Sequence, residues 1–132
     1  MEPITVDAIA ARLEDFECVV EVGIGNRTAV AAELLARGVA VTATDVYERP
    51  VPDGVRFVRD DVTDPTPSVY ADAGAVYALN LPPELHRPTR AVARNVDAAF
   101  LFTTLGGDEP TVPVAREQLP GDTMYEAASD RS

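Results

Sequence analysis

The sequence predicts an α/β fold with a mostly parallel, doubly wound sheet, and three observations lead to this prediction. Short runs of β-branched and apolar residues recur along the chain, as in buried strands. Stretches with helical spacing separate several of these runs. Glycines or acids follow some of the runs at the points where strands should end. Strands that alternate with helices favour right-handed crossovers and therefore a Rossmann-like sheet.

The expected elements follow in chain order. Helical patterns cover residues 5–15 and 26–38, and a further helix should begin at Pro88. Strands are expected over residues 17–22, 39–45, 55–58, 75–81 and 98–105. Residues 107–127 contain a Leu-Pro-Gly-Asp turn signal between two extended stretches, which predicts an antiparallel hairpin on the sheet edge. The alternative for this stretch is a disordered acidic tail.

The length of 132 residues is that of one ordinary domain. We expect a single domain over residues 1–127 and a frayed end over residues 128–132. No apolar run approaches the roughly 18–20 residues of a membrane span. The acidic N-terminal stretch does not resemble a signal peptide, so we expect a cytoplasmic protein without membrane contact. One cysteine and one histidine are too few for a metal site, and none is expected.

The charge of the chain is strongly negative. There are 22 acids against 11 bases, every base is arginine, and the formal net charge is −11. Molar salt shortens the Debye length to about 3 Å and screens such self-repulsion. This composition therefore predicts a halophilic protein. An acidic surface usually argues against nucleic acid, but salt adaptation explains it equally well, so nucleic acid stays among the partners to consider.

A glycine pair follows the first expected strand, in Glu21-Val-Gly23-Ile-Gly25. In a parallel sheet, ligands bind beyond the carboxyl ends of the strands, and glycines let the backbone approach a ligand closely. Asp45 ends the second strand, 22 residues after Gly23, where an acid can accept bonds from both ribose hydroxyls. The dinucleotide fingerprint requires a third glycine at the position of Thr28, so the motif fits NAD poorly.

The stretch "EVGIG" resembles the E/D-x-G-x-G motif of Rossmann-type S-adenosylmethionine (SAM) methyltransferases. The resemblance implies that Glu21, Gly23 and Gly25 face the methionine part of SAM and that Asp45 binds the ribose. It also implies that Asp61 binds the adenine amine while Val62 offers its backbone to the ring. Many methyltransferases have a third glycine where this chain has Arg27.

A second candidate site follows the fourth expected strand, in "ALNLPPELH". Its Asn-Leu-Pro-Pro loosely resembles the Asn/Asp-Pro-Pro-aromatic motif of methyltransferases that modify adenine amines. The resemblance implies that Asn80 accepts a hydrogen bond from the target amine, although Leu81 breaks the spacing and the aromatic residue is missing. His86 is the one histidine, and histidine is the side-chain type that can serve as an acid or base near neutral pH. Asn80 and His86 are therefore the catalytic candidates, and a rigid proline turn is the structural alternative.

The whole chain is similar to a small archaeal family known as Uncharacterised Protein Family 0146. The stretches "EVGIGNR", "VTATDV", "FVRDDVTDP" and "YALNLPPELH" carry this resemblance, over roughly residues 1 to 127. Members of the family tend to have Arg-Pro-Pro where this chain has Leu81-Pro82-Pro83. The family is similar to a shortened SAM-methyltransferase fold, and its name establishes no activity.

Two functions from different classes follow. The chain is expected to be a small SAM-dependent methyltransferase with an unknown acceptor, or a non-catalytic Rossmann module that binds a nucleotide or a partner protein. An NAD(P)-binding module is a third possibility, and the threonine at position 28 counts against it. The nucleotide side of the motif is better preserved than the acceptor side, and fold analogy alone does not choose among these functions.

Overall fold

The computed structural model describes residues 1–128. It contains seven strands and four α-helices within this range, together with one short 3₁₀ turn. In chain order, the elements are α1 (Pro3–Leu13), β1 (Cys18–Val22), α2 (Ala29–Ala36), β2 (Ala40–Asp45), β3 (Arg56–Arg59), α3 (Pro67–Tyr70), β4 (Ala75–Ala78), η1 (Pro83–Leu85), α4 (His86–Asn95), β5 (Ala99–Phe102), β6 (Val114–Leu119) and β7 (Asp122–Ala127). The predicted frayed end, residues 128–132, lies outside the described residues except for Ala128.

All seven strands form one sheet in the order β3-β2-β1-β4-β5-β7-β6. Strands β1 to β5 pair in parallel, whereas β7 is antiparallel to both β5 and β6. The order of the parallel strands reverses at β1, which lies between β2 and β4. Because β1 to β5 are parallel, their carboxyl ends share one edge of the sheet. This carboxyl edge at the reversal point is where open α/β sheets bind ligands.

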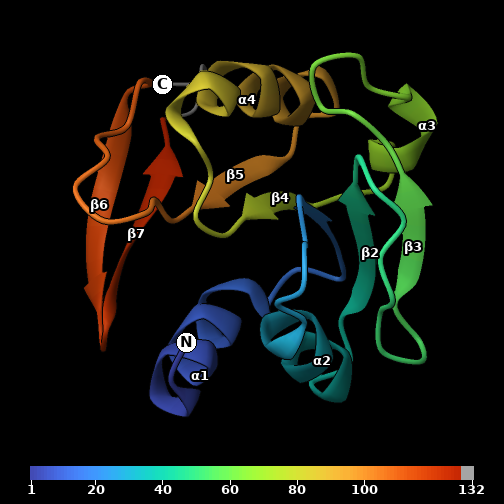
Figure 1. The fold of residues 1–132 in the computed structure, drawn as a ribbon, viewed down its shortest axis with the longest axis horizontal. Helices are drawn as coiled ribbons and strands as arrows, with labels where there is room; N and C mark the ends of the chain where they lie inside the picture. The colour runs from blue at the N-terminus through green and yellow to red at the C-terminus, as the bar shows by residue number, and fades with distance from the viewer. Residues whose placement is uncertain (129–132) are drawn as a thin grey trace.

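The sheet is the middle of three layers (Figure 1). Helices α1 and α2 cover one face, and α3 and α4 cover the other. Each face has its own apolar core, since β-strand side chains alternate between the two faces. Ile9, Leu13 and Leu34 belong to the first core, and Val92 and Phe100 belong to the second. The two cores together fix the direction of every strand that ends at the carboxyl edge.

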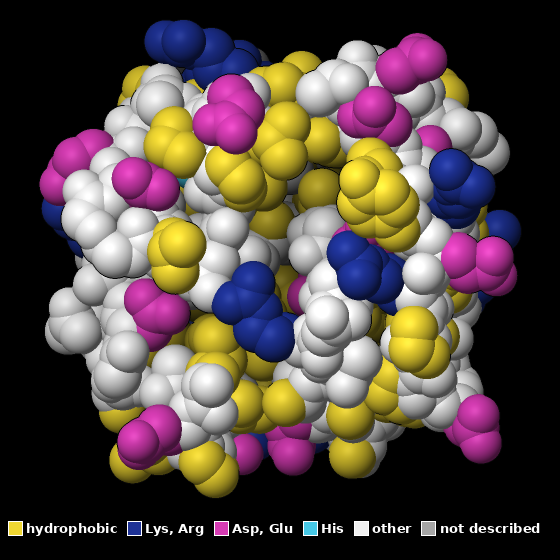
Figure 2. Space-filling view, in the orientation of Figure 1, with side chains coloured by type: hydrophobic (Ala, Val, Ile, Leu, Met, Phe, Trp, Pro, Cys, Tyr) yellow, Lys and Arg dark blue, Asp and Glu magenta, His cyan; other side chains and the backbone are white. Residues whose placement is uncertain are grey.

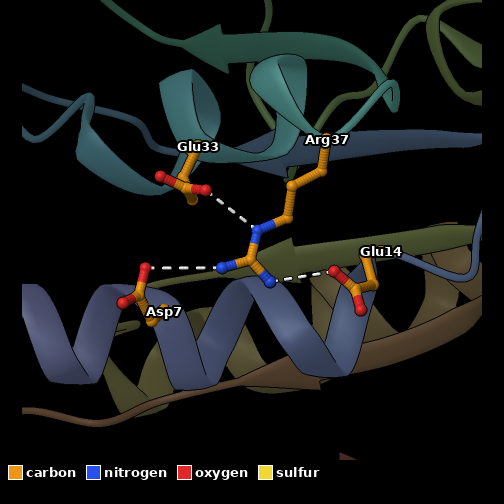
Figure 3. Close-up of polar contacts among 4 residues, drawn as sticks. All are labelled: Asp7, Glu14, Glu33 and Arg37. Atoms are coloured by element: carbon orange, nitrogen blue, oxygen red, sulfur yellow. Dashed lines mark hydrogen bonds and ion pairs between the residues drawn. The ribbon is translucent and has the colours of Figure 1, made fainter.

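The outer surface of α1 and α2 is joined by a single arginine (Figure 3). Arg37 donates to Glu33 from Nε (2.9 Å), to Glu14 from Nη1 (2.8 Å) and to Asp7 from Nη2 (3.3 Å). The hydrogen bonds from Arg37 to Glu33 and Glu14 raise the pKa of Arg37 further above its ordinary value. In this acidic chain, one base therefore offsets three acids on two helices. Exposed pairs of this kind stabilise a fold only modestly.

The predicted hairpin is confirmed, and the disordered alternative is wrong. Strands β6 and β7 pair from Val114↔Ala127 to Leu119↔Asp122, and the turn has Gly121 at φ +83°. Thr5 of α1 donates to the Pro120 carbonyl oxygen of this turn (2.7 Å). The hairpin thus extends the sheet beyond β5 and is anchored to the first helix.

Several predicted boundaries are too long, and most of these errors lie at the carboxyl edge. The helix predicted over 26–38 begins only at Ala29, because the preceding residues form the glycine loop. The strands predicted over 75–81 and 98–105 end at Ala78 and Phe102. The helix expected from Pro88 begins earlier, at His86. Apolar residues at these strand ends continue the pattern of the strand although the backbone has already turned into a loop.

Candidate functional site at the carboxyl edge

The glycine loop between β1 and α2 is held by the residue between its two glycines. Ile24 is buried, with 1% of its surface exposed, and its N–H donates to the Thr44 carbonyl oxygen (3.0 Å). Gly23 and Gly25 on either side have φ of +69° and +56°, which is the left-handed region that favours glycine. No heavy atom lies within 4 Å of the position that a Cβ would take at Gly23. The loop therefore leaves open space beside its first glycine.

Asp45, at the end of β2, binds this loop. Its Oδ2 accepts a hydrogen bond from the Gly25 N–H (2.8 Å), and its Oδ1 accepts one from the Tyr47 N–H (3.0 Å). The side chain is only 8% exposed. Arg49 Nε lies 3.5 Å from Oδ1. A ribose at this carboxylate must therefore share it with the loop and with Arg49.

Arg49 folds back over the end of β2. Its guanidinium lies 5.4 Å from the centre of the Tyr47 ring, and its Nη1 donates to Asn26 Oδ1 (3.4 Å). Its Nε is buried and makes no hydrogen bond within residues 1–128. The arginine thus has weak partners around Asp45, an arrangement that a bound ligand can rearrange at little cost.

The two acids after β3 have different surroundings. Asp60 is buried and accepts hydrogen bonds from the Thr66 N–H (3.0 Å) and the Tyr70 hydroxyl (3.0 Å). Asp61 is exposed, and its Oδ1 accepts from both the N–H and the hydroxyl of Thr63 (2.9 and 2.7 Å). These two bonds lower the pKa of Asp61. Its second carboxylate oxygen has no hydrogen-bond partner within residues 1–128, so a ligand can reach it.

An open depression of about 440 Å³ lies between the ends of β2 and β3, lined by Val46, Arg59, Asp60 and Asp61. Val46 is 46% exposed there, which is unusual for a large apolar side chain in this chain. Val62, the predicted backbone partner of an adenine ring, follows directly and has its own side chain buried. The depression thus combines an apolar surface with carboxylate oxygens.

Glu21 lies inside the sheet rather than at its surface. It is 1% exposed, and its Oε1 accepts a hydrogen bond from the Tyr77 hydroxyl (2.6 Å) on the neighbouring strand β4. Burial raises the pKa of Glu21 to about 8, although the Tyr77 bond and the nearby Arg27 charge both lower it. Burial and the adjacent carboxylate raise the pKa of Tyr77 well above its ordinary value. At neutral pH, Glu21 is mostly protonated and carries no charge.

Asn80 joins three loops of the carboxyl edge. Its φ is +51°, a conformation that is uncommon for a residue other than glycine. Its N–H donates to Thr103 Oγ1 (2.9 Å). With the amide orientation that satisfies both of its neighbours, its Oδ1 accepts from Arg27 Nη1 and its Nδ2 donates to the Thr104 carbonyl oxygen (3.3 Å). The side chain therefore connects the glycine loop to the segments after β4 and β5.

His86 is buried at the start of α4, and both ring nitrogens have partners. Its Nδ1 accepts from the Thr111 N–H (3.1 Å), which places the proton of the neutral ring on Nε2. Nε2 then donates to the Leu81 carbonyl oxygen (2.9 Å). The ring also contacts Phe102, with centroids 4.7 Å apart. In this arrangement His86 holds the loop after β4 and has no free nitrogen for an acceptor.

A second open depression borders the glycine loop. It measures about 280 Å³ and is lined by residues at the start of α2, including Asn26, Arg27 and Thr28, together with Leu79 and Met1. Figure 2 shows a hollow at the centre of this face of the molecule, with basic side chains on two sides of it. In the matching ribbon view, the loop before α2 and the end of β4 lie at the same place.

The structure therefore brings most of the predicted site residues to one edge. Gly25 is hydrogen-bonded to Asp45, Gly23 lies in the same loop, and Glu21 lies on β1 just before this loop. Asp61 and Val62 lie at the adjoining strand end, Asn80 reaches the loop through Arg27, and His86 is buried apart from it.

The sequence analysis missed several partners of these residues. Tyr77 donates a hydrogen bond to Glu21, and Arg49 lies beside Asp45. Asp60, which accepts a hydrogen bond from Tyr70, was also missed. Only the Glu21↔Tyr77 register of neighbouring strands would reveal the first of these pairs.

The described residues contain neither a metal-binding cluster nor a helix suited to crossing a membrane. Within residues 1–128, there is no group of three or more histidine, cysteine or acidic side chains arranged to hold a metal ion. None of the helices in this range has both the length and the apolar character that a membrane crossing requires.

Comparison with solved structures defines the class of fold. An RNA methyltransferase from Salinibacter ruber in complex with S-adenosyl-L-homocysteine superposes with a TM-score of 0.64 at 16% identity, covering 96% of this chain and 91% of that one. Magnesium protoporphyrin IX methyltransferase from Synechocystis with bound SAM gives 0.66 at 14% identity, covering 93% and 77%. The chain thus has the Rossmann-like fold of SAM-dependent methyltransferases.

The sequence comparisons identify the family. The model of the uncharacterised protein family UPF0146 matches residues 4–127, and the chain belongs to this family. A UPF0146 protein of Halobacterium salinarum is 56% identical over 122 residues, covering 92% of this chain and 95% of the relative. One from Archaeoglobus fulgidus is 51% identical over 90 residues, covering 68% and 69%. The relatives are archaeal, and one of them comes from a halobacterium.

Proposed function

We propose that the chain binds SAM, or a closely related adenosyl nucleotide, at the carboxyl edge beside Gly23 and Gly25. One observation carries the proposal. The Asp45 carboxylate is bonded to the Gly25 N–H, and open depressions of about 440 and 280 Å³ border this pair of loops. A ligand centred on Asp45 has room for an aromatic base on one side and for an extended polar tail on the other.

The parts of SAM match this layout. The ribose lies at Asp45, the adenine ring packs on Val46 with its amine toward Asp61, and the methionine part runs past Gly23. The fit is supported by the open space beside Gly23, where any side chain would project into the path of the ligand. The backbone of Val62 is the further contact for the ring.

For a methyltransferase, SAM would supply an electrophilic methyl group on a sulfonium sulfur. The residues of this chain would position that group and exclude water from it, which methyl transfer needs more than acid–base chemistry. Asn80 and His86 remain the candidates nearest to an acceptor. Their hydrogen-bonding groups are already paired within the protein, so they are better placed to shape the acceptor side than to exchange a proton with an acceptor.

That pairing favours a second candidate function, a non-catalytic module that binds the nucleotide or a partner protein. In such a module the loops after β4 and β5 serve only to hold the glycine loop in place. An NAD(P)-binding module receives less support, because Thr28 stands where the dinucleotide fingerprint has its third glycine. The acceptor, a protein partner and a nucleic-acid partner all remain to be sought by experiment.

The proposal is tested by calorimetric titration of the purified chain in molar KCl with SAM, S-adenosylhomocysteine, NAD and NADP. We expect micromolar binding of the two SAM-type ligands and none of the dinucleotides. Binding of NAD or NADP alone would replace the proposal by the dinucleotide function. No binding of any of the four would leave the glycine loop as a turn and direct the search to protein partners.

A further inference from the structure

Among the residues that the structure describes, no acid is paired with the guanidinium of Arg27, although the chain has twice as many acids as bases. Arg12, Arg37, Arg49 and Arg116 each lie within 4.0 Å of at least one carboxylate oxygen. Within residues 1–128, Arg27 has no such neighbour, and the same holds for Arg56, Arg59, Arg87 and Arg90. Arg27 is distinguished by its contact, the amide oxygen of Asn80. In a protein of net charge −11, an exposed arginine that meets an amide is available to an anion.

The group beneath Arg27 does not neutralise it. Glu21 is the acid whose pKa the Arg27 charge lowers, but burial dominates and keeps that pKa at about 8. At neutral pH the carboxyl therefore holds a proton, and its Oε1 accepts a hydrogen bond from the Tyr77 hydroxyl. The positive charge of Arg27 is directed toward the ligand side without a compensating charge from inside.

Asn80 fixes the direction of this charge. Its strained backbone (φ +51°) is held by the bond from its N–H to Thr103, and its amide bridges Arg27 and the Thr104 carbonyl oxygen. Strained residues of this kind cluster at ligand sites, where the surrounding contacts hold them. Arg27 also lines the depression of about 280 Å³ at the start of α2, which has room for a small anionic group.

We propose that Arg27, positioned by Asn80, binds a carboxylate or phosphate group of a ligand seated at the glycine loop. The inference rests on the proposed nucleotide site and adds that this site selects ligands with an anionic group. The planar fork of an arginine matches two oxygens of a carboxylate or phosphate, and such charge-assisted bonds are stronger than neutral ones. The anion comes either from the methionine part of SAM or from a second molecule bound next to it.

The first test compares two ligands that differ by one carboxylate, SAM and decarboxylated SAM, by calorimetry at constant KCl. The variants are Arg27→Gln, Arg27→Lys and the matched control Arg56→Gln, an exposed arginine at the opposite end of β3. If the carboxylate is that of SAM, the wild type prefers SAM by about tenfold or more, the scale of a charged hydrogen bond. Arg27→Gln loses this preference, Arg27→Lys keeps part of it, and Arg56→Gln keeps all of it.

The second test asks whether the anion belongs to another molecule. Protein saturated with S-adenosylhomocysteine is titrated with inorganic phosphate while the side-chain Nε resonances of ¹⁵N-labelled arginine are followed. A shift of the resonance that is absent from the Arg27→Gln spectrum assigns the anion to a second ligand. Thermal unfolding of each variant establishes that the folded protein is being compared.

The outcomes separate this inference from the proposed function. If SAM binds but Arg27→Gln changes neither the ligand preference nor the phosphate response, the inference is wrong and the nucleotide site stands. If no adenosyl ligand binds while phosphate shifts the Arg27 resonance of the free protein, the proposed function is wrong and the anion site stands. The absence of both effects overturns both.

Discussion

The two halves of the carboxyl edge differ in how their polar groups are used. Around β1 to β3, left-handed glycines and exposed Val46 leave open space, and one carboxylate oxygen of Asp61 has no hydrogen-bond partner within residues 1–128. After β4 and β5, the polar groups of Asn80 and His86 are already paired within the protein. Asn80 donates to Thr103, and His86 accepts from Thr111. We infer that the first half is shaped for a ligand and that the second half supports it. The predictions below test this division.

The largest expected effect concerns Glu21, which lies beneath the first half. Its pKa is about 8 in the folded protein against an ordinary 4.5, so the folded state binds the proton more tightly than the unfolded state. The stability contributed by this proton is full at low pH and is lost as pH rises from about 4.5 to about 8. That loss corresponds to about 5 kcal/mol.

The measurement is denaturant unfolding between about pH 5 and pH 9 at constant KCl. Glu21→Gln should remove this part of the pH dependence and be the more stable protein above pH 8. Glu48→Gln, at an exposed acid in the loop after β2, should leave the slope unchanged. Equal slopes for the wild type and Glu21→Gln would mean that Glu21 is ionised in the folded state.

The next largest effect concerns His86, in the supporting half. His86→Ala removes a fully buried ring and leaves the Thr111 N–H and the Leu81 carbonyl oxygen without this partner. We expect about 3 kcal/mol of destabilisation, from lost packing and two broken hydrogen bonds. His86→Phe, which keeps the ring volume, should lose less.

Below its unfolding temperature, His86→Ala should bind SAM with wild-type affinity. The folded variants are compared by calorimetry at low temperature. A loss of SAM affinity in a variant that remains folded would contradict the division, because it would place His86 at the ligand.

A substitution at Asp45 should have the opposite effect to one at His86: it should weaken SAM binding more than it lowers the stability of the fold. Asp45→Asn keeps the shape of the side chain and an oxygen for the Gly25 N–H, but it removes the charge that holds ribose hydroxyls. We expect SAM affinity to fall by about 1.5–3 kcal/mol. Asp53→Asn, at an exposed acid before β3, is the control because it removes the same negative charge away from the site. Unchanged affinity in Asp45→Asn would move the ribose elsewhere.

The smallest effect on folding comes from a pair of glycines. Gly23 and Gly38 both have positive φ (+69° and +88°), and neither has an atom within 4 Å of an added Cβ. Alanine at either position should cost about 1–2 kcal/mol of stability, the cost of a left-handed residue. Only Gly23→Ala should also weaken SAM binding, since Gly38 lies at the other end of α2. Equal SAM affinities in the two variants would place the ligand away from the loop.

Much of the fold could be predicted from the sequence, because buried parallel strands and their helices leave clear apolar patterns. The hairpin was predicted from the turn signal around Gly121 and the two extended stretches beside it. The boundaries failed at the carboxyl edge, where Leu79, Leu81 and Leu105 continue the apolar pattern past the strand ends. The loop after β4 buries Leu79 and Leu81, whereas Leu105 is 65% exposed, and the sequence pattern separates neither loop from a strand.

The sequence predicted which residues belong to the candidate site but not which of them contact one another. The spacing of Gly23, Gly25 and Asp45 indicates a shared edge, and the structure adds the bond between the last two. The sequence offers no way to decide that Asp60 is turned inward while the adjacent Asp61 is exposed, because this depends on how the chain leaves β3. Nor does it reveal that Asn80 reaches Arg27, since 53 residues separate them and a left-handed backbone aims the amide.

The most direct test of a ligand site in the first half is backbone amide chemical-shift mapping with S-adenosylhomocysteine. The account predicts the largest shifts at Gly23, Gly25, Val46 and Asp61, with small shifts along α4. Shifts confined instead to the cavity of about 370 Å³ between α3 and α4, around Ala91 and Val96, would contradict it. So would the absence of any shift at saturating ligand.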